Sequence, residues 1–162
     1  MGDYIALAWP PGQPGQAASA MRNAILADGW RVAYEEFCIL VCVKGARVPR
    51  VQVLPRRQGV LIGEIYDTEA TLARAEPAFD PAILADLDPQ DAALVLARCA
   101  WGRYVAIFTP AKGPPFVFRD PLGGLECVTW ARDDVYLVSS QIPTSGPHAP
   151  QDLAIDLSLI HI

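Results

Sequence analysis

The stretch WGRYVAIF, residues 101–108, carries apolar side chains at consecutive positions. Successive residues of a strand point to opposite faces of a sheet, so Tyr104, Ala106 and Phe108 share one face while Val105 and Ile107 share the other. A sheet with one face in water would alternate apolar and polar residues instead. This stretch therefore predicts a strand whose sheet is covered on both faces.

Similar strand-like segments occur along the chain, with helical segments among them. Strands are predicted at 4–9, at 31–45 as one long strand or two, at 48–58 and at 59–67. Four further short strands between 101 and 142 follow one another at hairpin spacing and predict an antiparallel meander. Helices are predicted at 17–29, 68–76 and 89–100. These elements favour an α+β domain in which two antiparallel sheets stack and helices cover the outside.

The composition excludes several classes of protein. Of the 162 residues 52% are hydrophobic, which indicates one domain with a substantial core. The formal net charge of −5, without a basic stripe, argues against binding to a nucleic-acid backbone. No apolar run reaches the roughly 18 residues needed to span a bilayer, and the N-terminus does not resemble a signal peptide. We therefore expect a cytoplasmic protein with no nucleic-acid or membrane partner.

The cysteines are expected to be reduced core thiols. They lie within apolar strand-like or helical segments: Cys38, Cys42, Cys99 and Cys127. Cys38 and Cys42 are four positions apart on one predicted strand, about 13 Å, which is too far for a disulfide. The cysteine spacing, with His148 and His161 distant in the sequence, has no metal-site pattern. We therefore assign no metal and expect no cofactor.

Two short motifs carry a resemblance to a known family. GEIYD occupies residues 63–67 and RDPLGG occupies residues 119–124. With the first apolar strand, WGRYVAIF, and VYLVSSQI at 135–142, they resemble the N-terminal glutaminase-type domain of asparagine synthetase relatives, nearest to lasso-peptide macrolactam synthetases and β-lactam synthetase. The resemblance implies a four-layer αββα sandwich of the Ntn-hydrolase-like type, with two antiparallel sheets flanked by helices.

The same resemblance implies where a glutaminase would hold its catalytic groups. The family's nucleophile is a cysteine exposed by removal of the initiator methionine, and Gly2 occupies that position here. The family's oxyanion-binding asparagine corresponds to Ile62, whose aliphatic side chain cannot donate a hydrogen bond. We therefore expect no glutaminase catalysis from this chain and assign no catalytic residue.

The remaining motif residues are expected to have structural roles. They are Gly63, Glu64, Tyr66, Arg119, Asp120 and Gly123. Glu64 follows a buried strand, where an acid favours the turn and helix that come next. Arg119 and Asp120 begin a turn in which Gly123 or Gly124 supplies a positive φ. The resemblance also implies an arginine that holds the substrate carboxylate, for which Arg47 and Arg50 are candidates; the alternative for each is an exposed charge in a loop.

The expected function is that of a catalytically inactive domain. Residues 1–142 would form the glutaminase-like domain, and residues 143–162 a proline-rich linker with the truncated start of a following element. The expected partners are an ATP-using synthetase domain that forms amide or lactam bonds and its peptide or acid substrate. The chain lacks the Ser-Gly-Gly-x-Asp-Ser pyrophosphate loop of such domains. Two alternatives stay open: a free-standing binding module on the same fold, and an amidohydrolase matured by internal cleavage ahead of Cys38 or Cys42.

Overall fold

The computed structural model describes residues 2–11, 15–36, 38–72 and 78–151, and its strands form two sheets. All pairs of neighbouring strands are antiparallel. Sheet A has the order β2-β3-β1-β9-β8 and consists of β1 (Asp3–Ala8), β2 (Arg31–Glu36), β3 (Ile39–Lys44), β8 (Val128–Arg132) and β9 (Val135–Ser139). Sheet B has the order β4-β5-β6-β7 and consists of β4 (Val51–Val53), β5 (Gly59–Asp67), β6 (Ala100–Phe108) and β7 (Phe116–Arg119).

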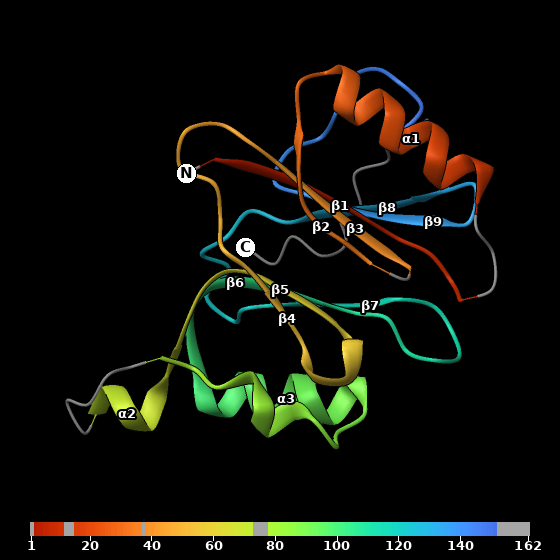
Figure 1. Ribbon diagram of the computed structural model, residues 1–162. Coiled ribbons are helices and arrows are strands. Elements are labelled where there is room, and N and C mark those ends of the chain that lie inside the picture. Colours follow the sequence, from red (N-terminus) through yellow and green to blue (C-terminus); the bar gives the residue numbers. More distant parts are fainter. Residues whose placement is uncertain (1, 12–14, 37, 73–77, 152–162) are drawn as a thin grey trace, which may run out of the picture.

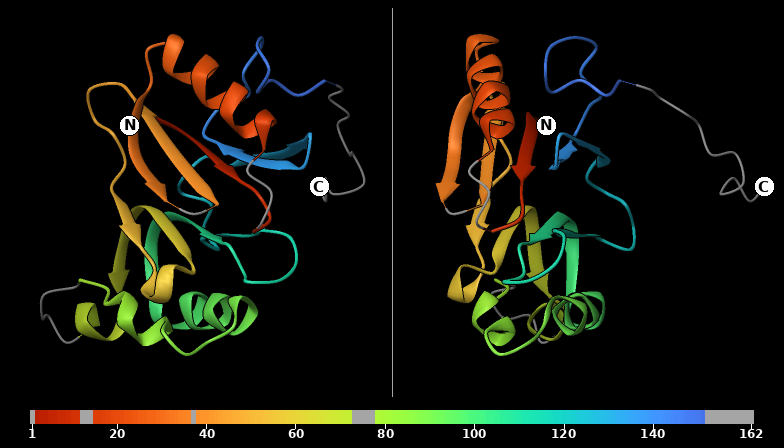
Figure 2. Two further views of the ribbon diagram at one scale, coloured as in Figure 1. Left: turned by 45° about the vertical axis from the view of Figure 1, so that its right-hand side comes forward. Right: turned by 90° about the vertical axis from the view of Figure 1, so that its right-hand side faces the viewer.

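The two longer helices lie on the outer faces of the sheets. Helix α1 (Gln16–Ala27) covers sheet A and α3 (Pro89–Cys99) covers sheet B, with the sheets between them (Figures 1 and 2). A short helix α2 (Thr68–Leu72) and two 3₁₀ turns (Pro55–Arg57 and Pro81–Leu84) complete the helical segments of the described residues. None of these described helices has the length and apolar character that crossing a bilayer requires. The prediction of an α+β fold with two antiparallel sheets is confirmed.

From Tyr104 to Phe108, strand β6 is buried on both faces, as its sequence predicts, whereas Trp101 and Arg103 are exposed. Val105 and Ile107 lie in the apolar core between the two sheets. Tyr104 and Phe108 point the other way and pack, with Leu96 of α3, in a second core. One strand therefore contributes to both apolar layers that hold sheet B in place.

Helix α1 packs on sheet A through residues at helical spacing. Ala18, Met21 and Ile25 are buried in a third core with side chains of β1, β3 and β9. The helix ends where Gly29 takes a φ of +82°, and the Gly29 N–H donates to the Leu26 carbonyl at 3.0 Å. Glycine adopts this left-handed conformation without the steric cost of a Cβ.

The structure corrects the predicted meander. Strands β6 and β7 pair in sheet B, whereas β8 and β9 pair in sheet A, so the connection at 120–127 passes from one sheet to the other. Residues 31–44 form the hairpin β2–β3, and Cys38 lies in its turn rather than on a strand. Hairpin spacing indicates antiparallel neighbours, but a strand that is apolar on both faces fits either sheet.

The predicted helix at 68–76 begins at Thr68, and its expected second half lies largely outside the described residues. Asp67, rather than Thr68, caps its start, because the Asp67 Oδ1 accepts a hydrogen bond from the Ala70 N–H at 2.7 Å. An aspartate in this position satisfies one of the unpaired N–H groups of the first turn.

Residues 143–151 pack on sheet A. The Trp130 Nε1 donates to the His148 carbonyl at 3.0 Å, and the Arg132 Nη1 donates to the Ala149 carbonyl at 2.9 Å. The side chain of His148 is itself buried. The described part of the expected linker is thus attached to the domain. The boundary at residue 142 stays a prediction, and residues 152–162 lie outside the described residues.

Candidate functional site

Gly2, at the position of the family's nucleophile, lies at the start of β1 against the connection between β3 and β4. Its N–H donates to the Arg47 carbonyl. A Cβ added to Gly2 would lie 2.6 Å from that carbonyl oxygen and 2.8 Å from the carbonyl oxygen of Lys44. Both obstacles are backbone atoms, so any side chain here requires the chain to move. This position fits glycine and provides no nucleophilic group.

Ile62, at the position of the family's oxyanion donor, is fully buried in the core between the sheets. The connection that contacts Gly2 also contacts β5 beside Ile62, because the Gly63 N–H donates to the Arg50 carbonyl at 2.8 Å. The structure therefore joins Gly2 to the predicted corner through residues 47–50. Arg47 and Arg50, the candidates for carboxylate binding, are both exposed in this connection.

Glu64 and Tyr66 make cross-strand pairs with β6. The Glu64 Oε2 lies 3.0 Å from the Arg103 Nη2, and both side chains are about half exposed. The rings of Tyr66 and Trp101 are 4.8 Å apart between centroids. Such pairs stabilise the ends of a two-stranded ribbon by roughly 0.2–1 kcal/mol each. Glu64 therefore lies within β5 and pairs with β6, whereas the start of the helix that follows is capped by Asp67.

Arg119 binds backbone groups of its own loop. Its Nε donates to the Leu125 carbonyl at 2.9 Å, and its Nη2 donates to the Gly123 carbonyl at 2.6 Å. Gly123 has a φ of +63°, the left-handed conformation expected for it in this turn. The guanidinium therefore holds the loop that leads from sheet B towards sheet A.

Asp120 is buried at 3% exposure and accepts hydrogen bonds from the same loop. Its carboxylate receives the N–H groups of Leu122 at 3.0 Å and Gly124 at 3.1 Å. Gly124 in turn packs against Arg103, because a Cβ at Gly124 would lie 2.5 Å from the Arg103 Cγ. Arg103 also pairs with Glu64 of GEIYD. Residues of both motifs, GEIYD and RDPLGG, therefore contact the same arginine.

The cysteines differ from their expected burial. All four are free, but only Cys42 is fully buried, while Cys38, Cys99 and Cys127 are partly exposed. Burial raises the pKa of Cys42 to about 11 and also raises the pKa of Cys38 and of Cys127. An activated nucleophilic cysteine requires a shift in the opposite direction.

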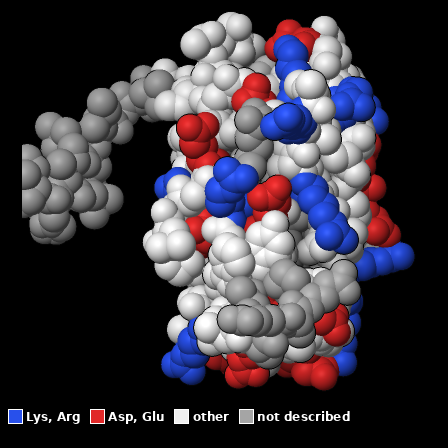
Figure 3. Space-filling view, turned by 90° about the vertical axis from the view of Figure 1, so that its left-hand side faces the viewer, with Lys and Arg blue, Asp and Glu red and all other residues white. Residues whose placement is uncertain are grey.

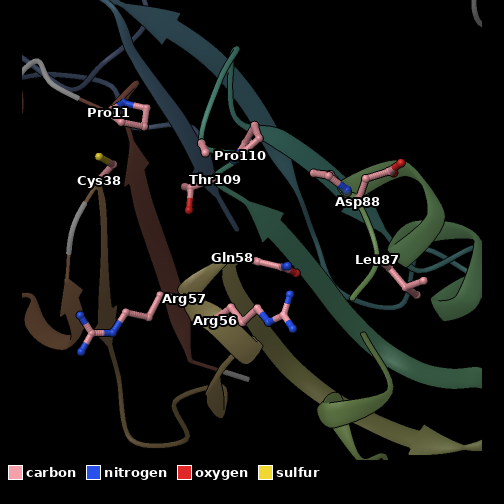
Figure 4. A pocket seen from close by; sticks show the side chains of 11 residues that line it. Pro11, Cys38, Arg56, Arg57, Gln58, Leu87, Asp88, Thr109 and Pro110 are labelled. Atoms are coloured by element: carbon pink, nitrogen blue, oxygen red, sulfur yellow. The ribbon is translucent and has the colours of Figure 1, made fainter. Parts of the chain in front are cut away.

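A cavity of about 450 Å³ lies at one end of the sandwich (Figure 4). It adjoins the C-terminal end of β1, whereas Gly2 lies at the N-terminal end of that strand. Its lining comes from five parts of the chain that are distant in sequence: the segment after β1, the β2–β3 turn, the β4–β5 turn, the start of α3 and the end of β6. Side chains that line it include Pro11, Cys38, Gln58, Leu87, Thr109 and Pro110.

Two consecutive arginines of the β4–β5 turn line this cavity. Arg56 and Arg57 have φ values of 54° and 58°, and the Gln58 N–H donates to the Pro55 carbonyl at 3.2 Å. This is the pattern of a type I′ turn, which favours asparagine and glycine. A left-handed conformation costs a residue such as arginine about 1 kcal/mol or more.

Each of these arginines also forms an ion pair at the rim of the cavity. The Arg57 Nη1 lies 2.9 Å from the Glu36 Oε1, and the Arg56 Nη2 pairs with the Asp86 Oδ1. Because all four side chains are at least one-third exposed, such pairs are worth about 0–1 kcal/mol and exchange readily.

Charged side chains of both signs are interspersed on the face that carries the N-terminal end of the molecule (Figure 3).

Across the part of the chain that the structure describes, no group of three or more His, Cys, Asp or Glu side chains is placed to hold a metal ion.

Comparison with known proteins identifies no relative, since no protein-family model, curated protein or solved structure matches the chain. The motif residues and the cavity therefore have to be interpreted from their own geometry. Neither GEIYD nor RDPLGG contributes a residue to the lining of the cavity. The only local sign of it is the pair Arg56–Arg57, two arginines between Pro55 and Gly59 where a turn would ordinarily place asparagine or glycine.

Proposed function

We propose that this chain is a catalytically inactive glutaminase-like domain that supports an ATP-dependent synthetase domain forming amide or lactam bonds. The proposed fold is the four-layer αββα, Ntn-hydrolase-like sandwich, and the order α1, sheet A, sheet B, α3 in Figure 1 is in keeping with it. One observation carries the proposal. Backbone carbonyls of Lys44 and Arg47 occupy the space that a side chain at Gly2 would need.

The other residues of the corner support the absence of catalysis. Ile62 is fully buried and has no donor group. Glu64 pairs with Arg103, and the side chains of Arg119 and Asp120 bind backbone groups of their own loop. These side chains stabilise the strands and the loop whose surface a partner domain would contact.

The two alternatives have less support. Cys42 lies in β3, which pairs with both β1 and β2, so a cleavage ahead of it would cut an internal strand of sheet A. The raised pKa of Cys38 also disfavours a thiolate nucleophile there. A binding module that uses a pocket lined by Ile62 would have to open the core between the sheets, because Ile62 has no exposed surface.

Glutamine hydrolysis tests the loss of catalysis. Purified protein incubated with glutamine and a thiol reductant should release no ammonia above the buffer blank. The Gly2→Cys variant should also be inactive, because its new side chain meets the Arg47 carbonyl and no oxyanion donor stands at Ile62. Gly15→Cys, whose Cβ has its nearest neighbour at 3.4 Å, is the matched control for an added thiol. Glutamine-dependent ammonia release by the unmodified protein would contradict the proposal.

Co-expression tests the supporting role. The probe is the synthetase with an S-G-G-x-D-S loop that is encoded closest to this chain. The two should co-purify, and the ATP-dependent release of pyrophosphate by the synthetase should fall when the domain is omitted. An equally soluble and equally active synthetase without this domain would overturn the proposed role.

A further inference from the structure

The cavity at the β4–β5 turn combines an apolar wall with two cations. Pro11, Leu87, Pro89, Pro110 and Ala111 supply apolar surface, whereas Arg56 and Arg57 come from one turn. Figure 4 shows their side chains leaving the turn in opposite directions, Arg57 towards the side of Cys38 and Arg56 towards the side of Leu87. The two guanidinium groups therefore lie on opposite sides of the turn.

The lining holds one acidic side chain, Asp88, whose charge offsets one of the two arginines. Asp88 caps α3, because its Oδ1 accepts the N–H groups of Gln90 and Asp91 at 2.9 Å each. Glu36 and Asp86 pair with the arginines but are not among the residues that line the cavity. A ligand carboxylate inside the cavity would thus compete with two exposed rim carboxylates, which hold the guanidiniums weakly.

Arg56 and Arg57 do not suit the backbone conformation of their turn. We therefore attribute their presence to what their side chains do. Asp133 and Asp134, in the β8–β9 hairpin, adopt a similar turn with φ values of 51° and 62°. Aspartate tolerates this conformation because its short side chain bonds to the local backbone, and arginine lacks that compensation. The strained turn with arginines is the one that faces the cavity.

A neighbouring hollow extends the apolar surface. It has a volume of about 310 Å³, shares Asp88, Pro89 and Pro110 with the first cavity, and adds Pro114, Pro115 and Phe116. A ligand with an apolar chain can therefore continue from the arginines along the start of α3 towards β7.

We propose that this cavity binds a small carboxylate with an apolar body, such as a medium-chain fatty acid or an N-acyl amino acid. The carboxylate pairs with Arg56 or Arg57, and the apolar body packs on the proline-rich wall. The cavity and Gly2 lie at opposite ends of β1. The inference is therefore separate from the proposed supporting function.

Isothermal titration with octanoate, octanol and octylammonium tests this assignment on the complete chain. We expect saturable binding of octanoate, at least about tenfold weaker binding of octanol, and no binding of octylammonium. Added salt should weaken octanoate binding by screening the ion pair. Equal binding of octanoate and octanol, binding of octylammonium, or no binding of octanoate at all would overturn the proposal.

A pair of double variants separates ligand binding from folding. Arg56→Asn with Arg57→Gly installs the residues that a type I′ turn prefers, so the melting temperature should stay the same or rise while octanoate affinity falls at least about tenfold. The matched control, Asp133→Asn with Asp134→Gly, installs the same Asn-Gly pair in the other turn and should leave affinity unchanged. Unchanged affinity in the arginine variant would refute the proposed role of these two residues.

Discussion

At the scale of single residues, close approach of backbones explains why some glycines of the predicted site are required. Gly63 has a φ of +116°, and a Cβ there would lie 2.1 Å from the Arg103 carbonyl oxygen of β6. On its other side the Gly63 N–H bonds to Arg50. The glycine of GEIYD is thus a steric requirement of the close approach between β5 and β6.

Gly63→Ala is expected to destabilise the fold by about 2–4 kcal/mol, the sum of left-handed strain and overpacking against β6. Gly29→Ala is the matched control, because Gly29 also has a positive φ but has no atom within 4 Å of its Cβ position. It should lose only about 1 kcal/mol from strain. Urea unfolding followed by circular dichroism measures both, and equal losses would contradict the steric explanation.

At the scale of elements, the loop of RDPLGG is built around a buried carboxylate. Asp120 accepts two N–H groups of the loop, and Arg119 donates to two of its carbonyls. The same loop connects β7 in sheet B to β8 in sheet A. Its conformation therefore decides how the second pair of strands reaches the other sheet.

Asp120→Ala leaves the Leu122 and Gly124 N–H groups without their acceptor and should cost about 1–3 kcal/mol of unfolding free energy. Asp120→Asn retains an acceptor oxygen and should cost less. Guanidinium chloride unfolding compares the two variants with the exposed-site control Glu126→Gln. An alanine variant as stable as the asparagine variant would show that these hydrogen bonds do not hold the loop.

At the scale of the whole molecule, we expect the segment at 143–151 to couple stability to pH. His148 is 4% exposed, and its Nδ1 has no hydrogen-bond partner among the described residues. Burial, the largest effect, and the nearby Arg132 lower its pKa below the usual 6.5, while Asp28 acts in the opposite direction. The neutral imidazole is therefore the form that the folded protein favours.

Because the unfolded chain then binds more protons than the folded protein, the free energy of unfolding should fall as pH drops below about 6.5 and level off once the folded-state pKa is passed. The His148→Gln variant stays neutral and should lose less stability between about pH 7.5 and 5.5. Urea midpoints at both pH values measure the difference. Equal losses in the two proteins would show that His148 does not cause the pH dependence.

Features that depend on local patterning can be predicted from the amino-acid sequence alone. Consecutive apolar residues in WGRYVAIF predict a strand buried on both faces, and Met21 and Ile25, one helical turn apart, predict α1. The alternation and spacing of side chains act over a few residues, so these elements and the α+β class follow from the sequence. The absence of a thiol at Gly2 is likewise visible in the sequence.

The three-dimensional structure was needed to establish which elements are in contact. It assigned β6–β7 and β8–β9 to different sheets, placed the Arg47 carbonyl against Gly2, and gathered five distant segments around the cavity beside Arg56 and Arg57. These arrangements depend on contacts between residues far apart in the chain. No local pattern encodes them, because the same hairpin or turn is compatible with several positions in a sandwich of two sheets.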